Sequence, residues 1–222
     1  RPTQVIADSE LGPLATTTEY LTGFKTRVTN PRNQITTTEY LSWDQPSTEL
    51  PMRIESPEGI VTTFTRDVFG KPTAITRSGT YLGNPISVTR RYVYDDKQRL
   101  CKTIEPESGA TIVEYDAADN ILWRTQGSML TTLTCDRASV PLSERSQYSY
   151  DAMNRVIAID HPNGTDDIGY TYFDDGALKT ATTQGSTWTY AYNKRRLPTQ
   201  ESLAFDSQTF NLNWGYDSNG TA

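Results

Sequence analysis

The chain has 222 residues, 35% of them hydrophobic, and a formal net charge of −6. This low hydrophobic share argues against a compact two-layer core, and 21 Lys and Arg without a basic block argue against nucleic acid as a partner. No run approaches the roughly 18 apolar residues of a membrane span, and the N-terminus has neither a signal-peptide layout nor an initial Met, so we expect a piece of a longer protein.

From the N-terminus, the first pattern is the string TTTEYL, which occurs at residues 16–21 and again at 36–41. The Tyr of this string starts a series that continues as YVYDDKQRL, VEYDAADNI, YSYDAMNRV and WGYDSNG, with weaker copies between them. The series predicts an imperfect repeat with a most common interval near 20 residues. We name its Tyr positions the anchors: Tyr20, Tyr40, Arg66, Tyr94, Tyr115, Cys135, Tyr150, Tyr172, Tyr192 and Tyr216.

Each repeat unit has the composition of two short strands and two turns. An aromatic or apolar residue often lies two positions before the anchor, on the same face of a strand. Asp follows the anchor in the clear copies, where its side chain can accept hydrogen bonds from backbone amides two residues on. Gly or Asn near the fourth position past the anchor favours a positive φ, and we assign this role to Gly70, Asn120, Asn154, Gly176 and Gly220.

A second turn closes each unit, and it often contains Pro followed by Gly or Asn. We expect reversals at Pro106–Gly109 and Pro162–Gly164, and an anchor turn at Asp151–Asn154. Paired reversals favour an all-β antiparallel meander over a parallel β-helix, whose rungs turn in one sense. No segment has the apolar spacing of a helix, so little helix is expected.

The ordered series of Tyr-Asp copies resembles the YD repeat of Rhs proteins, teneurins and the C component of insecticidal toxin complexes. The clear copies are YDDKQRL, YDAADNI, YDAMNRVIAIDHPNGT and YTYFDDGAL. The resemblance is clear over residues 92–220 and weaker over 23–91, so we divide the chain into divergent repeats at 1–91 and clear repeats at 92–222. The structural anchors are Tyr94, Asp95, Tyr115, Asp116, Tyr150, Asp151, Tyr172, Tyr192, Tyr216 and Asp217.

The resemblance implies hairpin repeats that form a long spiralling sheet, a segment of a hollow shell enclosing a C-terminal toxin effector until delivery. It implies two kinds of partner, the remainder of the shell with its effector and a secretion-system spike or toxin-complex B component. It also implies export by a specialised bacterial delivery system. The chain departs from the pattern where Phe173 and Asn193 replace Asp and where Arg66 and Cys135 replace Tyr. No part of the chain matches the Asp-containing self-cleaving segment that such proteins often carry.

The residues give little support for an enzyme, so we expect no catalytic, cofactor-binding or metal-binding residues. The acidic pairs Asp166–Asp167 and Asp174–Asp175 lie in expected turns, and the oxygen-rich stretch DHPNGTDD lacks calcium-loop spacing. His161 is the only histidine and precedes a Pro in a turn. Cys101 and Cys135 do not make a disulfide framework, and we expect unpaired thiols on strands.

The aromatic residues leave one alternative open, a carbohydrate- or surface-binding module. Sugars could stack on an exposed face formed by the repeated Tyr residues with Trp43, Trp123, Trp188 and Trp214. The competing interpretation is a cross-strand aromatic ladder that stabilises the sheet itself, and recurrence of Tyr at one position of every unit favours it.

Overall fold

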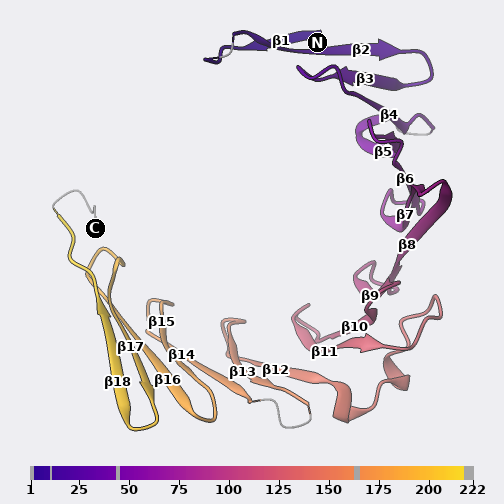
Figure 1. Ribbon diagram of the computed structural model, residues 1–222. Coiled ribbons are helices and arrows are strands. Elements are labelled where there is room, and N and C mark those ends of the chain that lie inside the picture. The colour runs from indigo at the N-terminus through magenta and orange to yellow at the C-terminus, as the bar shows by residue number, and fades with distance from the viewer. Residues whose placement is uncertain (1–2, 11, 44–45, 163–165, 218–222) are drawn as a thin grey trace. The chain divides into compact units, whose positions relative to one another are not determined.

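The computed structural model describes residues 3–10, 12–43, 46–162 and 166–217, and it confirms the predicted all-β meander (Figure 1). Eighteen strands lie in these residues, and each pairs antiparallel with its chain neighbours within a unit; the only helical segments described are two short 3₁₀ turns. The chain forms two compact units, residues 1–109 and 110–222. The sequence division at residue 91 marks where the repeat becomes clear, and it does not coincide with this structural division.

The strands of the first unit follow one another in chain order. They are β1 (Gln4–Ala7), β2 (Leu14–Leu21), β3 (Lys25–Thr29), β4 (Ile35–Leu41), β5 (Ser47–Glu55), β6 (Val61–Arg66), β7 (Pro72–Tyr81), β8 (Asn84–Tyr94) and β9 (Leu100–Glu105). The second unit begins in β10 (Gly109–Tyr115) and continues through β11 (Ile121–Ser128), β12 (Ser146–Tyr150), β13 (Val156–Asp160), β14 (Ile168–Tyr172), β15 (Leu178–Thr182), β16 (Ser186–Tyr192), β17 (Pro198–Phe205) and β18 (Gln208–Asn213).

Two of the three expected reversals are present. A turn occupies residues 106–108, and the Asn154 amide donates to the Asp151 carbonyl at 3.0 Å. The third, at Pro162–Gly164, falls largely on residues outside the described part of the chain.

The segment between β11 and β12 corrects the expected repeat series. Residues 129–145 form no strand and instead contain 3₁₀ turns at Arg137–Ser139 and Leu142–Glu144, so Cys135 is not a strand anchor. The reason is packing, because this segment folds back on the sheet. Arg137 Nε donates to the Val113 carbonyl at 2.9 Å, and the guanidinium of Arg145 lies 4.1 Å from the ring centroid of Trp123.

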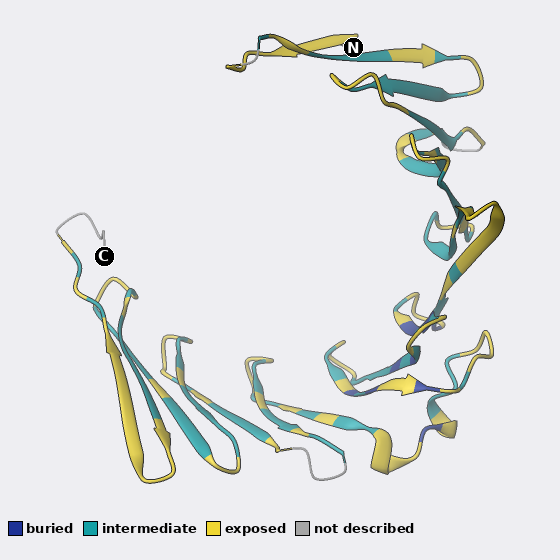
Figure 2. Ribbon diagram, in the orientation of Figure 1, coloured by how far each residue is buried: buried dark blue, intermediate teal, exposed yellow. Residues whose placement is uncertain are grey.

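The buried residues are few and concentrated. The buried apolar residues of the described chain all lie between positions 101 and 140, and strands outside this region are half-buried or exposed (Figure 2). In the second unit they are Ala110 and Ile112 on β10, Trp123 on β11 and Val140 in the 129–145 segment. A single-layer sheet has no opposing layer to bury its side chains, which explains the low hydrophobic share of the sequence.

The cysteines also differ from expectation. Cys101, fully buried on β9, and Cys135 are both disulfide-bonded, so neither is the free thiol that the sequence suggested. A cysteine count by itself could not distinguish the two states.

Candidate functional site: the anchor seam and the two sheet faces

A five-residue turn follows five of the anchors and occurs once more between two anchors, and we call it the Asx turn. An Asp or Asn oxygen accepts hydrogen bonds from the amides two and four residues further on, at 2.8 to 3.1 Å. These turns begin at Asn30, Asp67, Asp95, Asp116, Asp151 and Asn193. Asn193 therefore replaces Asp without loss of the turn, because an amide oxygen accepts the same two bonds.

The fourth residue of the Asx turn has a positive φ, as it must for the chain to reverse. Gly70 and Asn154 have it as expected, as does Gly176 in the five-residue turn that begins at Phe173, whereas in the turn after Tyr115 it belongs to Asp119 and not to Asn120. Asn120 is the fifth residue, and its side-chain amide donates to the Asp116 carboxylate at 3.1 Å. Gly220 lies outside the described residues.

Two of these turns are also closed by an arginine at their fifth position. Arg99 forms an ion pair with Asp95 at 2.9 Å, and Arg155 forms one with Asp151 at 2.6 Å. The hydrogen bond from the Arg155 side chain is the main reason why the pKa of Asp151 lies below its usual value. The carboxylate of the repeat Asp thus accepts hydrogen bonds from groups of its own turn and has a structural role.

The hydroxyls of four anchors join their repeat units to the preceding ones, and we call this row of contacts the seam. The hydroxyl of Tyr150 donates to the Ile121 carbonyl at 2.9 Å, and that of Tyr172 donates to the Val156 carbonyl at 2.7 Å. Equivalent bonds join Tyr94 to Pro72 at 3.0 Å and Tyr216 to Pro198 at 2.7 Å.

One rule describes the acceptor of every seam bond. The accepting residue is the cross-strand partner of the preceding anchor: Ile121 pairs with Tyr115, Val156 with Tyr150, Pro72 with Arg66 and Pro198 with Tyr192. Arg66 obeys the same rule although it is not a Tyr. Its Nη2 donates at 3.0 Å to the carbonyl of Pro51, the partner of Tyr40.

Cationic side chains reinforce the seam from the fifth position of the Asx turns. Arg155 lies 4.4 Å from the ring centroid of Tyr172, and Lys71 lies 5.1 Å from that of Tyr94. Arg155 therefore contacts both its own Asp151 and the anchor of the next unit.

The other two predicted anchors make different contacts. Tyr192 packs edge to face against Phe173, with ring centroids 6.1 Å apart, so Phe173 replaces Asp with an aromatic contact. Tyr115 lies beneath Arg137, whose guanidinium is 6.0 Å from the ring. The backbone of Asp217 accepts a bond from Arg195 at 3.2 Å, and its turn extends beyond the described residues.

The two faces of the sheet differ in chemistry, most clearly in the second unit. One continuous cross-strand row consists of Tyr170, Ala181, Trp188, Leu203 and Phe210. The adjacent row, on the other face, consists of Thr171, Thr180, Thr189, Ser202 and Asn211. The anchors Tyr172 and Tyr192 lie two residues from Tyr170 and Tyr190, on the aromatic face.

The first unit has one face rich in charged pairs. Arg27 bonds Glu19 at 3.2 Å and Lys25 bonds Glu39 at 3.0 Å, each pair directly opposite across neighbouring strands. These exposed pairs contribute little individually.

Within residues 3–10, 12–43, 46–162 and 166–217, the structure brings no acid–base constellation together. Ser146 Oγ lies 3.3 Å from His161 Nδ1, but Asp167 accepts the His161 backbone amide at 2.8 Å and does not orient its ring. Asp175 is paired with Arg196, and the described residues contain no group of three or more potential metal ligands. No helix in the described residues has the length and apolar character needed to cross a membrane.

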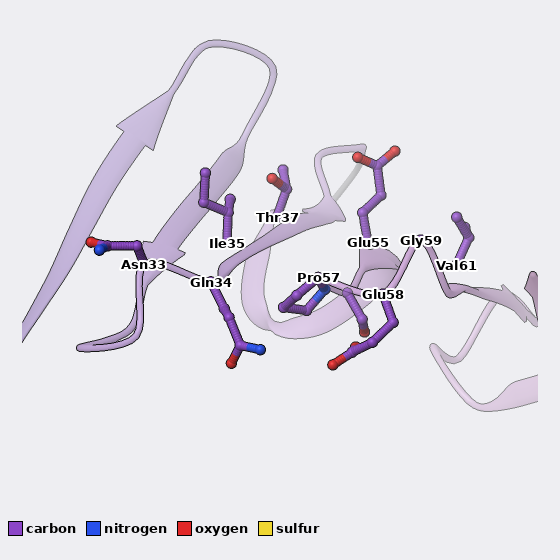
Figure 3. Close-up of a pocket in the computed structure, with 10 residues that line it drawn as sticks. Asn33, Gln34, Ile35, Thr37, Glu55, Pro57, Glu58, Gly59 and Val61 are labelled. Atoms are coloured by element: carbon purple, nitrogen blue, oxygen red, sulfur yellow. The ribbon is translucent and has the colours of Figure 1, made fainter.

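A surface hollow of about 590 Å³ lies between the turns at residues 30–34 and 56–60, and its acidic side chains are not arranged as a catalytic pair. Figure 3 shows its two carboxylates, Glu55 and Glu58, pointing to opposite sides, so they do not converge on a common point. The four tryptophans are not equally exposed, as a common sugar-binding face would require. Trp43 is 74% exposed, whereas Trp123 is 5% exposed and Trp188 and Trp214 are half-buried.

Known proteins share this repeat. The chain is 27% identical over 181 residues to a protein named Probable deoxyribonuclease RhsA from Dickeya dadantii (strain 3937), covering 77% of this chain and 12% of that protein. The corresponding RhsB protein is 27% identical over 155 residues, covering 65% and 10%. The chain is related to the Rhs and YD-repeat proteins. No family model matches the sequence.

Solved structures share the fold of this chain. The structure of TcdB2-TccC3 without its hypervariable C-terminal region aligns with a TM-score of 0.65 at 14% identity, over 97% of this chain and 12% of that one. The Photorhabdus luminescens Tc holotoxin pore aligns with a TM-score of 0.58 at 11% identity, over 95% and 15%. The chain thus spans about a tenth to a seventh of the length of these proteins, and the match concerns repeats alone.

The seam predicts the cost of removing one hydroxyl. Tyr150→Phe should destabilise the chain by about 1 kcal/mol, because the Ile121 carbonyl loses its donor, and Tyr150→Ala by about 2 to 3 kcal/mol, because packing is lost as well. Urea denaturation measures both. Tyr81→Phe, at an exposed hairpin position, is the matched control and should be neutral; equal stability of all variants would contradict the seam.

The seam also predicts loss of stability at high pH. Burial raises the pKa of Tyr94, Tyr150 and Tyr172, so folding favours the neutral phenol. This contribution is complete below the unfolded tyrosine pKa of about 10 and disappears as pH rises through the higher folded pKa values. Urea midpoints between pH 8 and 12 should fall, and less steeply in Tyr150→Phe/Tyr172→Phe. An unchanged slope in that variant would argue against hydroxyl involvement.

Proposed function

We propose that this chain is a wall segment of a hollow YD-repeat shell, which encloses a C-terminal toxin effector until delivery. The observation that carries the proposal is the seam. It links unit to unit by one repeated bond within a single-layer sheet, so a wall can be extended without a second layer or a central core. Similarity to Rhs proteins and to components of Tc toxins supports the same role.

The two-faced sheet fits a wall that separates contents from solvent. An aromatic face and a hydroxyl-rich or charged face suit two different environments, and a sheet exposed equally on both sides would have no reason to differ so consistently. The partners under this proposal are the remaining repeats of the shell and the enclosed effector, with a secretion spike or toxin-complex component as the docking partner.

The proposed wall is exported and has no catalytic activity of its own. Disulfide-bonded cysteines support an oxidising compartment. The deoxyribonuclease activity in the names of the relatives belongs, under this proposal, to parts of those proteins outside the repeats. Asp166, Asp167, Asp174 and Asp175 then serve turns, as the bonds of Asp167 and Asp175 support.

The proposal predicts that weakening the seam exposes the contents. In the full-length protein that contains this segment, the C-terminal domain should resist proteinase K at least tenfold longer than the same domain produced alone. Tyr150→Ala/Tyr172→Ala should shorten that protection, because two adjacent seam bonds are lost, whereas the exposed-site variant Tyr81→Ala should not. A C-terminal domain digested equally fast with and without the repeats would overturn the wall function.

A further inference from the structure

Equivalent positions in the repeat copies can be compared, and a residue that departs from the other copies at such a position is not required by the fold. In each Asx turn the second and third residues form the tip, and the turn makes no use of their side chains. The tips are polar or small in most copies, as in Asp96–Lys97, Ala117–Ala118 and Lys194–Arg195. In the turn that begins at Asp67 the tip is Val68–Phe69, exposed by 93% and 67%. Among the other tips only Met153, 60% exposed, is comparable. Stability therefore does not explain Val68 and Phe69.

A second departure from the repeat lies directly beside this tip. Where β4 pairs with β5, the register jumps from Tyr40–Pro51 to Leu41–Ser47, which leaves residues 48–50 outside the ladder. The displaced Leu50 packs against Gly70, with Cδ1 3.4 Å from where a Cβ would lie. The connection also carries Trp43, the most exposed Trp of the chain at 74%. The two departures from the repeat thus meet at one place.

Together they form a hollow of about 760 Å³ within the first unit, which we call the Trp43 hollow. Apolar side chains form most of its lining, and carboxylates lie among them. The residues that matter for the argument are Trp43, Leu50, Val68, Phe69, Glu49 and Asp67. Exposed aromatic and aliphatic side chains in one concavity are typical of an interaction surface.

We propose that the Trp43 hollow binds a protein segment that presents a large apolar side chain next to a Lys or Arg. The apolar lining provides the pocket for the anchor residue, and the exposed Glu49 carboxylate at the same hollow complements a neighbouring cation. The guanidinium of Arg66, which also lines the hollow, is already bonded to the carbonyls of Gly70 and Pro51. The chain's net charge of −6 acts in the same direction. This interaction is additional to the wall function and does not depend on enclosure.

The polar groups favour a protein over a sugar as the occupant. Sugar recognition needs several free donors and acceptors around an aromatic platform. Here an Asp67 oxygen accepts the Phe69 and Lys71 amides, and the Ser47 hydroxyl accepts the Glu49 amide. These oxygens are used by the turns that form the hollow, and the Arg66 guanidinium is bonded to the carbonyls of Gly70 and Pro51, which leaves few free polar groups to a sugar.

Two synthetic peptides test the proposal on the 222-residue chain, acetyl-Gly-Ser-Lys-Leu-Phe-Lys-Ser-Gly-amide and its analogue with Glu in place of both Lys. Titration is followed by the indole N–H signal of Trp43 in ¹⁵N NMR. We expect saturable shifts with the Lys peptide and at least tenfold weaker binding of the Glu peptide. Val68→Asp/Phe69→Lys should weaken binding at least tenfold. This variant copies the Asp96–Lys97 tip of a turn that folds normally, and its melting temperature checks the fold.

The matched control is Ala152→Asp/Met153→Lys, the same change in an Asx turn of the second unit, which should leave peptide binding unaltered. Chitohexaose and phosphatidylcholine vesicles are titrated in parallel. The proposal is overturned if neither peptide shifts the Trp43 signal, if both bind equally, if the two tip variants behave alike, or if only the sugar or the vesicles produce the shift.

Discussion

A single hydrogen bond, from the hydroxyl of one anchor to the carbonyl opposite the preceding anchor, sets the geometry on which the rest of the repeat depends. Backbone ladders hold neighbouring strands together, but they do not fix how one hairpin follows the next around the turn end. The bond from Tyr172 to Val156 does so, because Val156 is already positioned by its pairing with Tyr150. A repeat unit that makes this bond therefore takes its position from the repeat unit before it. This is why the sheet can be stable with few buried apolar residues.

The Asx turn makes this bond possible. Its side-chain acceptor and its positive-φ residue return the chain so that the residue after the turn lies opposite the anchor, and a register shift in the ladder recurs at this point in unit after unit. An ordinary two-residue hairpin, such as the one at Leu82–Gly83, lacks this offset. The combination of turn, offset and hydroxyl bond is what a Tyr-Asp pair encodes, which explains why the two residues occur side by side.

Much of this could be predicted from the sequence, because turn chemistry is local. Tyr spacing, Asp after the anchor and Gly or Asn beyond it identified the meander and the turn at Asp151–Asn154. The seam could not be predicted, since it joins residues 16 to 29 positions apart and its acceptors are backbone carbonyls of any residue type. Arg66 shows the difficulty, because the sequence placed it at an anchor position but gave no sign that its guanidinium would donate to the Pro51 carbonyl. The 129–145 segment was misread because Cys135 followed by Asp imitates an anchor, while the packing of Arg145 on Trp123 is a tertiary contact.

The rule for the seam acceptor has a consequence for how such chains change in length. The interval between joined anchors is 22 residues from Tyr150 to Tyr172 but 35 from Tyr115 to Tyr150, and the seam bond is intact in both cases. After Tyr115 the additional residues enter beyond the acceptor, at the margin of the sheet opposite the anchors, whereas after Tyr40 they enter before the acceptor, where residues 48–50 leave the ladder. Insertions during evolution can thus accumulate along either border of a continuous sheet, as long as the residue opposite each anchor keeps its place and its carbonyl still accepts the bond from the next unit.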